Sequence, residues 1–348
     1  MIFFIYLTFI SLLVLSLIYR KNIISVSIYL NLVTVLLLAL IFLKDGSIIP
    51  DYQVYKDLYN TIVSGNYNIL IEPSYILISL ICSKFGNLGF QCLLLIYGFI
   101  SLRLIFKTLL LSYRNIDYAV LLYFSNAFII FNIVQIRAGI ALCFIYLAIL
   151  SSKTIKSYII YMLTAVFFHY SSIIFFPLIF LKKLKLNNLT ILILFFASYF
   201  CSTFFKEIFL LVLEIIPDSD IATKLLTYTY ESRADLFSIN LLNPFILSKI
   251  LLLFILLFFR KKMITINGNS NLLLKMYFFA IFIYISFSSF PEISVRLSNI
   301  LFVSEIILIT ILINLFKQQR FVQFSLIMFC FFMLFYNVQY NSYFNYSL

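Results

Sequence analysis

Residues 2–44 read IFFIYLTFISLLVLSLIYRKNIISVSIYLNLVTVLLLALIFLK, which is two apolar runs separated by Arg20, Lys21 and Asn22. Each run has close to the ~20 residues that an α-helix needs to cross the hydrocarbon core of a bilayer. Neither run alternates apolar and polar residues with a period of two, which is the pattern of a membrane β-strand. This stretch therefore predicts two membrane-spanning helices joined by a short basic turn.

The composition extends this prediction to the whole chain. Of 348 residues, 64% are hydrophobic and 11% are charged, whereas soluble domains average about 45–50% and 25%. We expect one all-α, polytopic integral membrane domain over residues 1–348, with about 12 transmembrane helices, some of them short. The apolar runs fall at 2–19, 23–43, 88–108, 117–134, 136–151, 157–168, 171–181, 188–205, 242–259, 272–290, 298–316 and 321–340.

The basic residues predict the orientation. The net charge of +12 is spread over short clusters between the apolar runs, so it reflects membrane orientation and not nucleic-acid binding. With Arg20 and Lys21 in the cytoplasm, strict alternation brings every later cluster to the same side. Of the 13 acidic residues, only Asp117 then lies at a cytoplasmic end.

This topology requires two short elements. Residues 73–83, after Pro73, span about half a bilayer at 1.5 Å each, and we expect a re-entrant or interfacial helix there. Residues 157–181 are expected to form a helical hairpin with His169 at its tip. A single 25-residue span is the alternative, but it would invert all later loops.

Two long outer loops are predicted, at 44–72 and 206–241. In the first, Tyr52, Tyr55 and Tyr59 have helical spacing, which predicts an amphipathic helix at the membrane interface. The five cysteines lie in or beside apolar runs and there is one histidine. We therefore interpret the cysteines as packing residues and expect no metal and no cofactor.

Arg137 and His169 are candidate site residues. Arg137 lies between two apolar runs, where it either faces a polar cavity or an anionic group, or snorkels from a span end. His169 has the only side chain whose unperturbed pKa lies near neutrality. It is either a base for an attacking hydroxyl or a histidine bonded to a backbone carbonyl.

Further candidates lie near the predicted outer face. Arg296 is either a second cation for a pyrophosphate or the partner of Glu292 one helical turn earlier. Arg233 is a third candidate cation with acidic neighbours. Asp51 and Glu72 flank the first outer loop and are suited to sugar hydroxyls, or else they make a turn and start a helix.

The ordered set of these pieces resembles the EpsG/Wzy-type family of bacterial polysaccharide polymerases. The matching pieces cover about residues 50 to 300. They are Asp51-Tyr52 with Tyr55 and Tyr59, Glu72-Pro73-Ser74-Tyr75, Gln135-Ile136-Arg137 with Ala138 and Ala141, Phe168-His169-Tyr170-Ser171-Ser172 before Pro177, and Arg296-Leu297-Ser298.

The resemblance implies a glycosyltransferase that moves a growing glycan from undecaprenyl pyrophosphate to a lipid-linked oligosaccharide repeat unit, on the outer face of the bacterial cytoplasmic (inner) membrane. Its partners would be undecaprenyl-pyrophosphate-linked oligosaccharide and the bilayer, and a chain-length regulator is a further candidate. An O-antigen-ligase-like glycosyltransferase and a polysaccharide flippase or transporter are the alternatives.

The family likeness and the side-chain chemistry together suggest a role for each candidate. Arg137 and Arg296, with Arg233, would bind pyrophosphate. His169 would be the base or bind the acceptor hydroxyl. Asp51 and Glu72 would contact the acceptor sugar, one of them being an alternative base, and Tyr52 and Tyr55 would bind substrate.

Overall fold

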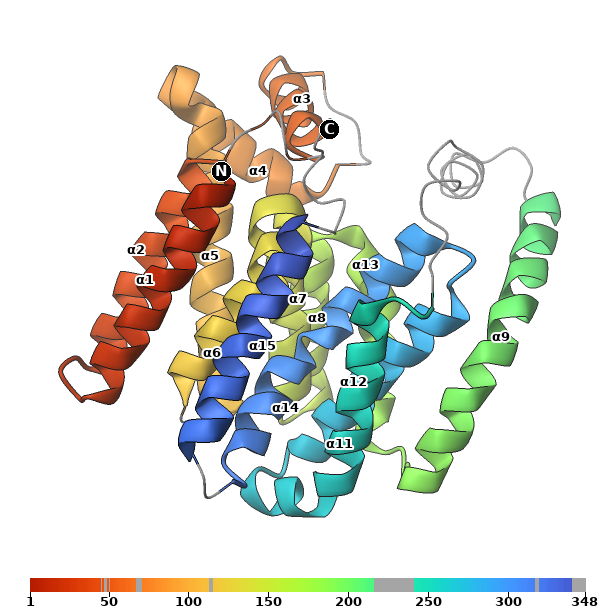
Figure 1. The fold of residues 1–348 in the computed structure, drawn as a ribbon. Helices are drawn as coiled ribbons and strands as arrows, with labels where there is room; N and C mark the ends of the chain where they lie inside the picture. The colour runs from red at the N-terminus through yellow and green to blue at the C-terminus, as the bar shows by residue number, and fades with distance from the viewer. Residues whose placement is uncertain are drawn as a thin grey trace. The chain divides into compact units, whose positions relative to one another are not determined.

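The computed structural model describes residues 1–44, 46, 49, 51–66, 71–112, 115–215, 241–316 and 319–339. Every regular element in these ranges is a helix (Figure 1), which confirms the all-α prediction. Within these ranges, six continuous helical stretches are long and apolar enough to cross a membrane by length and composition, and five shorter apolar helices accompany them. The protein is a multi-pass helical membrane protein, while the expected total of about 12 crossings stays a prediction.

The chain divides into two compact units. Unit 1 comprises Met1–Ile179 with Phe316–Leu348, and unit 2 comprises Phe180–Leu315. The helices of unit 1 are α1 (Ile2–Arg20), α2 (Val26–Phe42), α3 (Tyr52–Val63), α4 (Pro73–Cys82), η1 (Ser83–Leu88), α5 (Gly89–Ser112), α6 (Ile116–Tyr123), η2 (Phe124–Val134), α7 (Ile136–Leu150), α8 (Ile155–Phe168), most of η3 (Tyr170–Lys182) and α15 (Gln319–Gln339). The helices of unit 2 are α9 (Asn188–Ile215), α11 (Pro244–Ile266), α12 (Ser270–Ser286), α13 (Pro291–Phe302) and α14 (Ser304–Ile313).

Helices α6, η2 and α7 form the centre of unit 1. The α6–η2 segment is 94% buried, whereas α1 is only 28% buried although both are apolar. A helix that is apolar on all sides and buried has protein neighbours all round, and α5 and α15 supply contacts here. The segment η2 is a π-helix, and in α15 the Asn337 side-chain amide donates to the carbonyl of Ser125 at 2.8 Å.

The one acidic residue expected at a cytoplasmic end has a structural partner. Asp117 is buried at the start of α6, where it forms an ion pair with Arg20 of α1. Ser16 of α1 donates a second hydrogen bond to the same carboxylate at 3.2 Å, and the Arg20 guanidinium lies 3.8 Å from the ring centroid of Tyr118. Asp117 therefore joins α1 to α6 at the end of the bundle that carries the α1–α2 turn.

Unit 2 is organised around α12, which contacts α9, α11, α13 and α14. Its apolar interior holds an ion pair, in which Lys249 Nζ lies 2.5 Å from Glu305 Oε1, with both side chains buried. Burying two charges is costly unless they pair. Both residues stand as charges within apolar runs of the sequence, and in the structure each is the other's partner.

The chain between 73 and 112 forms two α-helices, as predicted, with a short 3-10 helix between them. Helix α4 begins at Pro73 and ends at Cys82, close to the expected 73–83. The short 3-10 helix η1 follows, and Gly86 within it has a φ of 57°, which breaks the helical path. Helix α5 starts again at Gly89. Whether α4 is re-entrant stays a prediction.

Residues 157–181 form the expected hairpin. The hydroxyl of Tyr158 in α8 donates to the carbonyl of Phe176 in η3 at 2.8 Å. In one continuous helix these residues would lie about 27 Å apart at 1.5 Å per residue. The single-span alternative is therefore wrong. The turn occurs at His169, whose extended backbone (φ −156°, ψ 112°) ends α8.

The two predicted loops contain helix. Helix α3 occupies much of 44–72, but Tyr55 and Tyr59 are buried. They pack against Tyr75 of α4 and Phe90 of α5, so this tyrosine face is covered by protein. In the second segment, residues 206–215 continue α9, residue 241 is part of a turn, and residues 216–240 lie outside the described part of the chain.

Gly139 allows a close approach between the two central helices. The turn at Gln135 brings α7 back against η2, and a Cβ at Gly139 would lie 2.2 Å from the carbonyl oxygen of Phe131. Because that oxygen belongs to the backbone, it cannot rotate away, and an added methyl group would force the helices apart.

We expect Gly139→Ala to lower the free energy of unfolding by about 1–3 kcal/mol, the usual cost of overpacking. Thermal unfolding in detergent measures this change. Gly98→Ala in α5 is the matched control, because its Cβ would meet the end of the flexible Ile41 side chain at 2.5 Å. Equal unfolding temperatures for the two variants would contradict the expected backbone clash.

Candidate active site in unit 1

Glu72 lies immediately before α4, and its side chain points away from that helix. Pro73 occupies the first helical position, and the Glu72 carbonyl accepts the first bond, from the Tyr75 amide at 2.9 Å. The carboxylate makes no capping bond to the helix. Its residue is 4% exposed, and a carboxylate this deeply buried needs partners elsewhere. Starting α4 is therefore not the role of this side chain.

Arg137 supplies the first partner. It is the second residue of α7, directly after the turn at Gln135, and its Nη1 forms an ion pair with Glu72 Oε2. The guanidinium carbon lies 5.1 Å from the ring centroid of Tyr55 and 5.6 Å from that of Tyr75. Its Nε is buried without a hydrogen-bond partner among the described residues. Arg137 thus faces an anionic group, Glu72, which is the first of the two interpretations drawn from the sequence.

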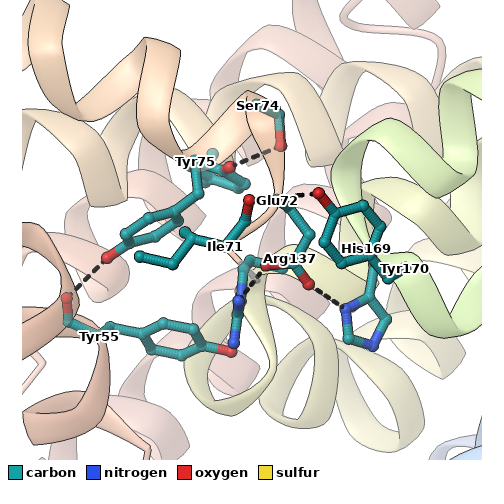
Figure 2. A network of polar contacts seen from close by, with 9 residues as sticks. Tyr55, Ile71, Glu72, Ser74, Tyr75, Arg137, His169 and Tyr170 are labelled. Atoms are coloured by element: carbon teal, nitrogen blue, oxygen red, sulfur yellow. Dashed lines mark hydrogen bonds and ion pairs between the residues drawn. The ribbon is translucent and has the colours of Figure 1, made fainter. Parts of the chain in front are cut away.

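His169 supplies the second partner from the tip of the α8–η3 hairpin. Its Nδ1 lies 3.0 Å from Glu72 Oε1, and its side chain is 25% exposed. Figure 2 shows the other ring nitrogen, Nε2, on the edge that faces away from Glu72. With Nδ1 carrying a proton that it donates to the carboxylate, Nε2 is the basic nitrogen. The alternative, a bond to a backbone carbonyl, does not apply to Nδ1.

A shell of hydroxyl groups fixes the segment that carries Glu72 (Figure 2). Tyr75 donates to the backbone carbonyl of Tyr55 at 2.7 Å, and Ser74 bonds the hydroxyl of Tyr97 at 3.2 Å. From the hairpin, Tyr170 donates to the carbonyl of Ile71 at 3.3 Å. These bonds connect residues 71–75 to α3, α5 and η3, so they hold the carboxylate between Arg137 and His169.

The charge of Glu72 is stabilised by its partners. Burial alone would raise the pKa of its carboxyl group, but the hydrogen bond with His169 and the positive charge of Arg137 lower the pKa below its ordinary value of 4.5. Glu72 is therefore ionised at neutral pH.

This shift predicts how stability depends on pH. Because the folded pKa of Glu72 is lowered, its contribution to stability is complete above about pH 4.5 and is lost as the pH falls through the folded value. We expect the difference in unfolding temperature between wild type and Glu72→Gln to be largest at pH 6 and to shrink towards pH 3. A difference that grows on acidification would contradict the assigned partners.

The other predicted residues do not all join the cluster. Tyr55 is part of the cluster: the residue is 4% exposed, and its ring lies beside the Arg137 guanidinium. Asp51 precedes α3, and no hydrogen bond or ion pair among the described residues links it to the cluster. Arg296 belongs to unit 2, where its Nη2 lies 2.5 Å from Glu292 Oε1. Arg233 lies outside the described residues.

Two residues near the cluster had no site assignment from the sequence. The ring of Tyr75 lies beside the Arg137 guanidinium, and its hydroxyl donates to the backbone of α3. In the sequence, the position of Tyr75 two residues after Pro73 was the one sign that it lies near Glu72. Lys44 ends the second apolar run and is 8% exposed. Tyr52 is its neighbour: Lys44 Nζ lies 5.6 Å from the centroid of the Tyr52 ring.

Comparison with known proteins gives one positive result. No curated protein and no solved structure matches this chain. The family model described as "EpsG family" matches residues 27–348, and this range contains the ordered motifs from Asp51 to Arg296. The match spans far more than half of the residues, so the chain belongs to the EpsG family.

Proposed function

We propose that this protein is a polysaccharide polymerase, which transfers a growing glycan from undecaprenyl pyrophosphate to a lipid-linked repeat unit. Membership of the EpsG family supports a polymerase role. The observation that carries the finer proposal is the Glu72 carboxylate shared between Arg137 and His169. It combines a cation suited to phosphate with an oriented imidazole in one cluster.

The cluster lies at the end of unit 1 that suits this reaction. Figure 1 shows α3 and α4 at one end of unit 1 and the α1–α2 turn at the other. That turn carries Arg20 and Lys21, and basic turns favour the cytoplasmic side. Glu72, Arg137 and His169 would then face the outer side, where a lipid-linked glycan after export is available.

His169 is the base in this proposal. The acceptor hydroxyl oxygen forms a bond with the anomeric carbon of the donor glycan, and its proton passes to His169 Nε2. Glu72 holds the ring through Nδ1 and stabilises the imidazolium that results, as a carboxylate does in a Ser-His-Asp triad. Glu72 is thus a positioning residue. This choice favours His169 over Asp51 and Glu72, the other candidate bases.

Arg137 stabilises the leaving group. As the new glycosidic bond forms, the bond between the anomeric carbon and the pyrophosphate oxygen breaks, and the lipid pyrophosphate takes up one more negative charge. A preorganised guanidinium stabilises such charge strongly in a site with little water. The Arg137 side chain is 19% exposed, and a phosphate oxygen would reach the guanidinium through this exposed part.

The test is polymerisation by purified protein in lipid nanodiscs, supplied with the lipid-pyrophosphate-linked repeat unit of its own gene cluster. Wild type should give a ladder of products on a gel. His169→Ala should remain inserted, lose the ladder and regain part of it with added imidazole. A folded wild type that gives no ladder but glycosylates a different acceptor would favour the ligase. One that gives no glycan transfer but, in proteoliposomes, moves the lipid across the bilayer would favour the transporter.

A further inference from the structure

A second buried cation lies near the cluster in unit 1. Lys44 follows α2 and is 8% exposed. Its amino group bonds only weakly to the carbonyl of Ile133, at 3.4 Å, four residues before Arg137 in sequence. No carboxylate among the described residues forms an ion pair with it. Burial lowers the pKa of Lys44 to about 7, so an anionic group bound beside the amine would favour its charged form.

Lys44 lines a small polar cavity. The cavity has a volume of about 50 Å³ and is bounded by Tyr52 of α3 and Gln91 of α5, among others. The side-chain oxygen of Gln91 is buried without a hydrogen-bond partner in the described residues. A space of this size holds about three waters, which is enough for one phosphate group and too little for a sugar ring.

An apolar groove adjoins this cavity. The groove has a volume of about 490 Å³ between α2 and α5, and it is lined by Leu38, Ala39, Phe42, Cys92, Leu95, Ile96 and Phe99. Phe42 lines both spaces, and Gln91 and Cys92, one in each lining, are consecutive. A cationic pocket at the end of an apolar groove is complementary to a molecule with an anionic head and a long hydrocarbon chain.

We propose that this groove and Lys44 bind the second lipid-pyrophosphate substrate, with its isoprenoid chain between α2 and α5 and a phosphate at Lys44. The inference rests on the proposed function, because a transfer between two lipid carriers needs two pyrophosphate sites close together. Arg137 serves the donor. Lys44, which contacts the same η2–α7 hairpin, serves the acceptor. A free phosphate would make no use of the apolar groove.

The test uses a polyprenyl pyrophosphate with a diazirine in its isoprenoid chain, photocrosslinked to the full-length protein in nanodiscs and mapped by mass spectrometry. We expect crosslinks on α2 and α5 along the groove, competed by unlabelled polyprenyl pyrophosphate and not by phosphatidylglycerol. Lys44→Met should reduce them at least tenfold. Lys56→Met, the same change at an exposed position of α3, should leave them unchanged.

One further variant and one further measurement complete the test. Ala39→Phe fills the groove, so it should reduce crosslinking while Lys44 is intact. Lys44→Met should also raise the unfolding temperature of the empty protein, because it removes an uncompensated buried charge. Crosslinking that persists in Lys44→Met, or that phosphatidylglycerol competes equally, would overturn the proposal.

The readout needs no glycan transfer. Crosslinks that depend on Lys44 in a protein without polymerase activity would therefore contradict the proposed function alone and leave the lipid site standing.

Discussion

Arg137→Lys should slow polymerisation by at least about 100-fold although it keeps the positive charge. The loss of one preorganised donor to a developing oxyanion costs about 10²–10³ in kcat. The Arg137 guanidinium holds Glu72 through Nη1, lies beside the rings of Tyr55 and Tyr75, and still has N–H groups for a phosphate. An ammonium group has no planar fork, so a lysine would have to choose between the carboxylate and the substrate.

The rate of ladder formation in nanodiscs measures this effect. Arg103→Lys is the matched control, because Arg103 lies on α5, makes no ion pair with Glu72 and donates to Asn31 of α2 at 2.9 Å. It should polymerise at the wild-type rate. If Arg137→Lys stays within about threefold of wild type, charge alone suffices and the bidentate role assigned to the guanidinium is wrong.

Glu72→Gln should reduce both the polymerisation rate and the stability of the protein. It leaves the Arg137 charge half-buried and unpaired, and removing one partner of a buried pair costs about 3–5 kcal/mol. It also removes the acceptor that fixes the His169 ring. Where a carboxylate orients a catalytic histidine, its replacement by an amide lowers kcat by about 10⁴, and we expect a loss of about 10³–10⁴ here.

Polymerisation rate and thermal unfolding, measured on the same preparation, separate the two effects. Asp57→Asn is the control, since Asp57 is exposed on α3 and accepts a bond from Gln53 at 2.8 Å. Glu72→Asp, which keeps the charge with a shorter side chain, should recover most of the stability and little of the activity. Full activity in Glu72→Gln would remove the carboxylate from the mechanism.

Local signals predicted the elements of the fold well. Pro73 gave the start of α4, because proline suits the first helical position. The clusters of lysine at both ends of 157–181 gave the α8–η3 hairpin, because they require both ends on one side of the membrane. The π-helix η2 could not be predicted, since its apolar residues show no period that differs from that of an ordinary buried helix.

The site was predictable as a set of residues but not as a set of contacts. Arg137 and His169 were visible as polar groups among apolar neighbours. Their common partner, Glu72, lies 65 and 97 positions away in sequence, and its proline neighbour offers a sufficient local explanation. Lys44 was missed for a similar reason, because a lysine at the end of an apolar run is usually solvated.

The return of α15 to unit 1 has a consequence for biosynthesis. Domains tend to fold in the order of synthesis, at about 5–20 residues per second. Unit 2 lies between Ile179 and Phe316, so the ribosome needs on the order of ten seconds to make it. During that time η2 lacks α15, and the Ser125 carbonyl lacks the Asn337 amide. The face of η2 that α15 covers therefore stays without that helix until the last part of the chain has been made.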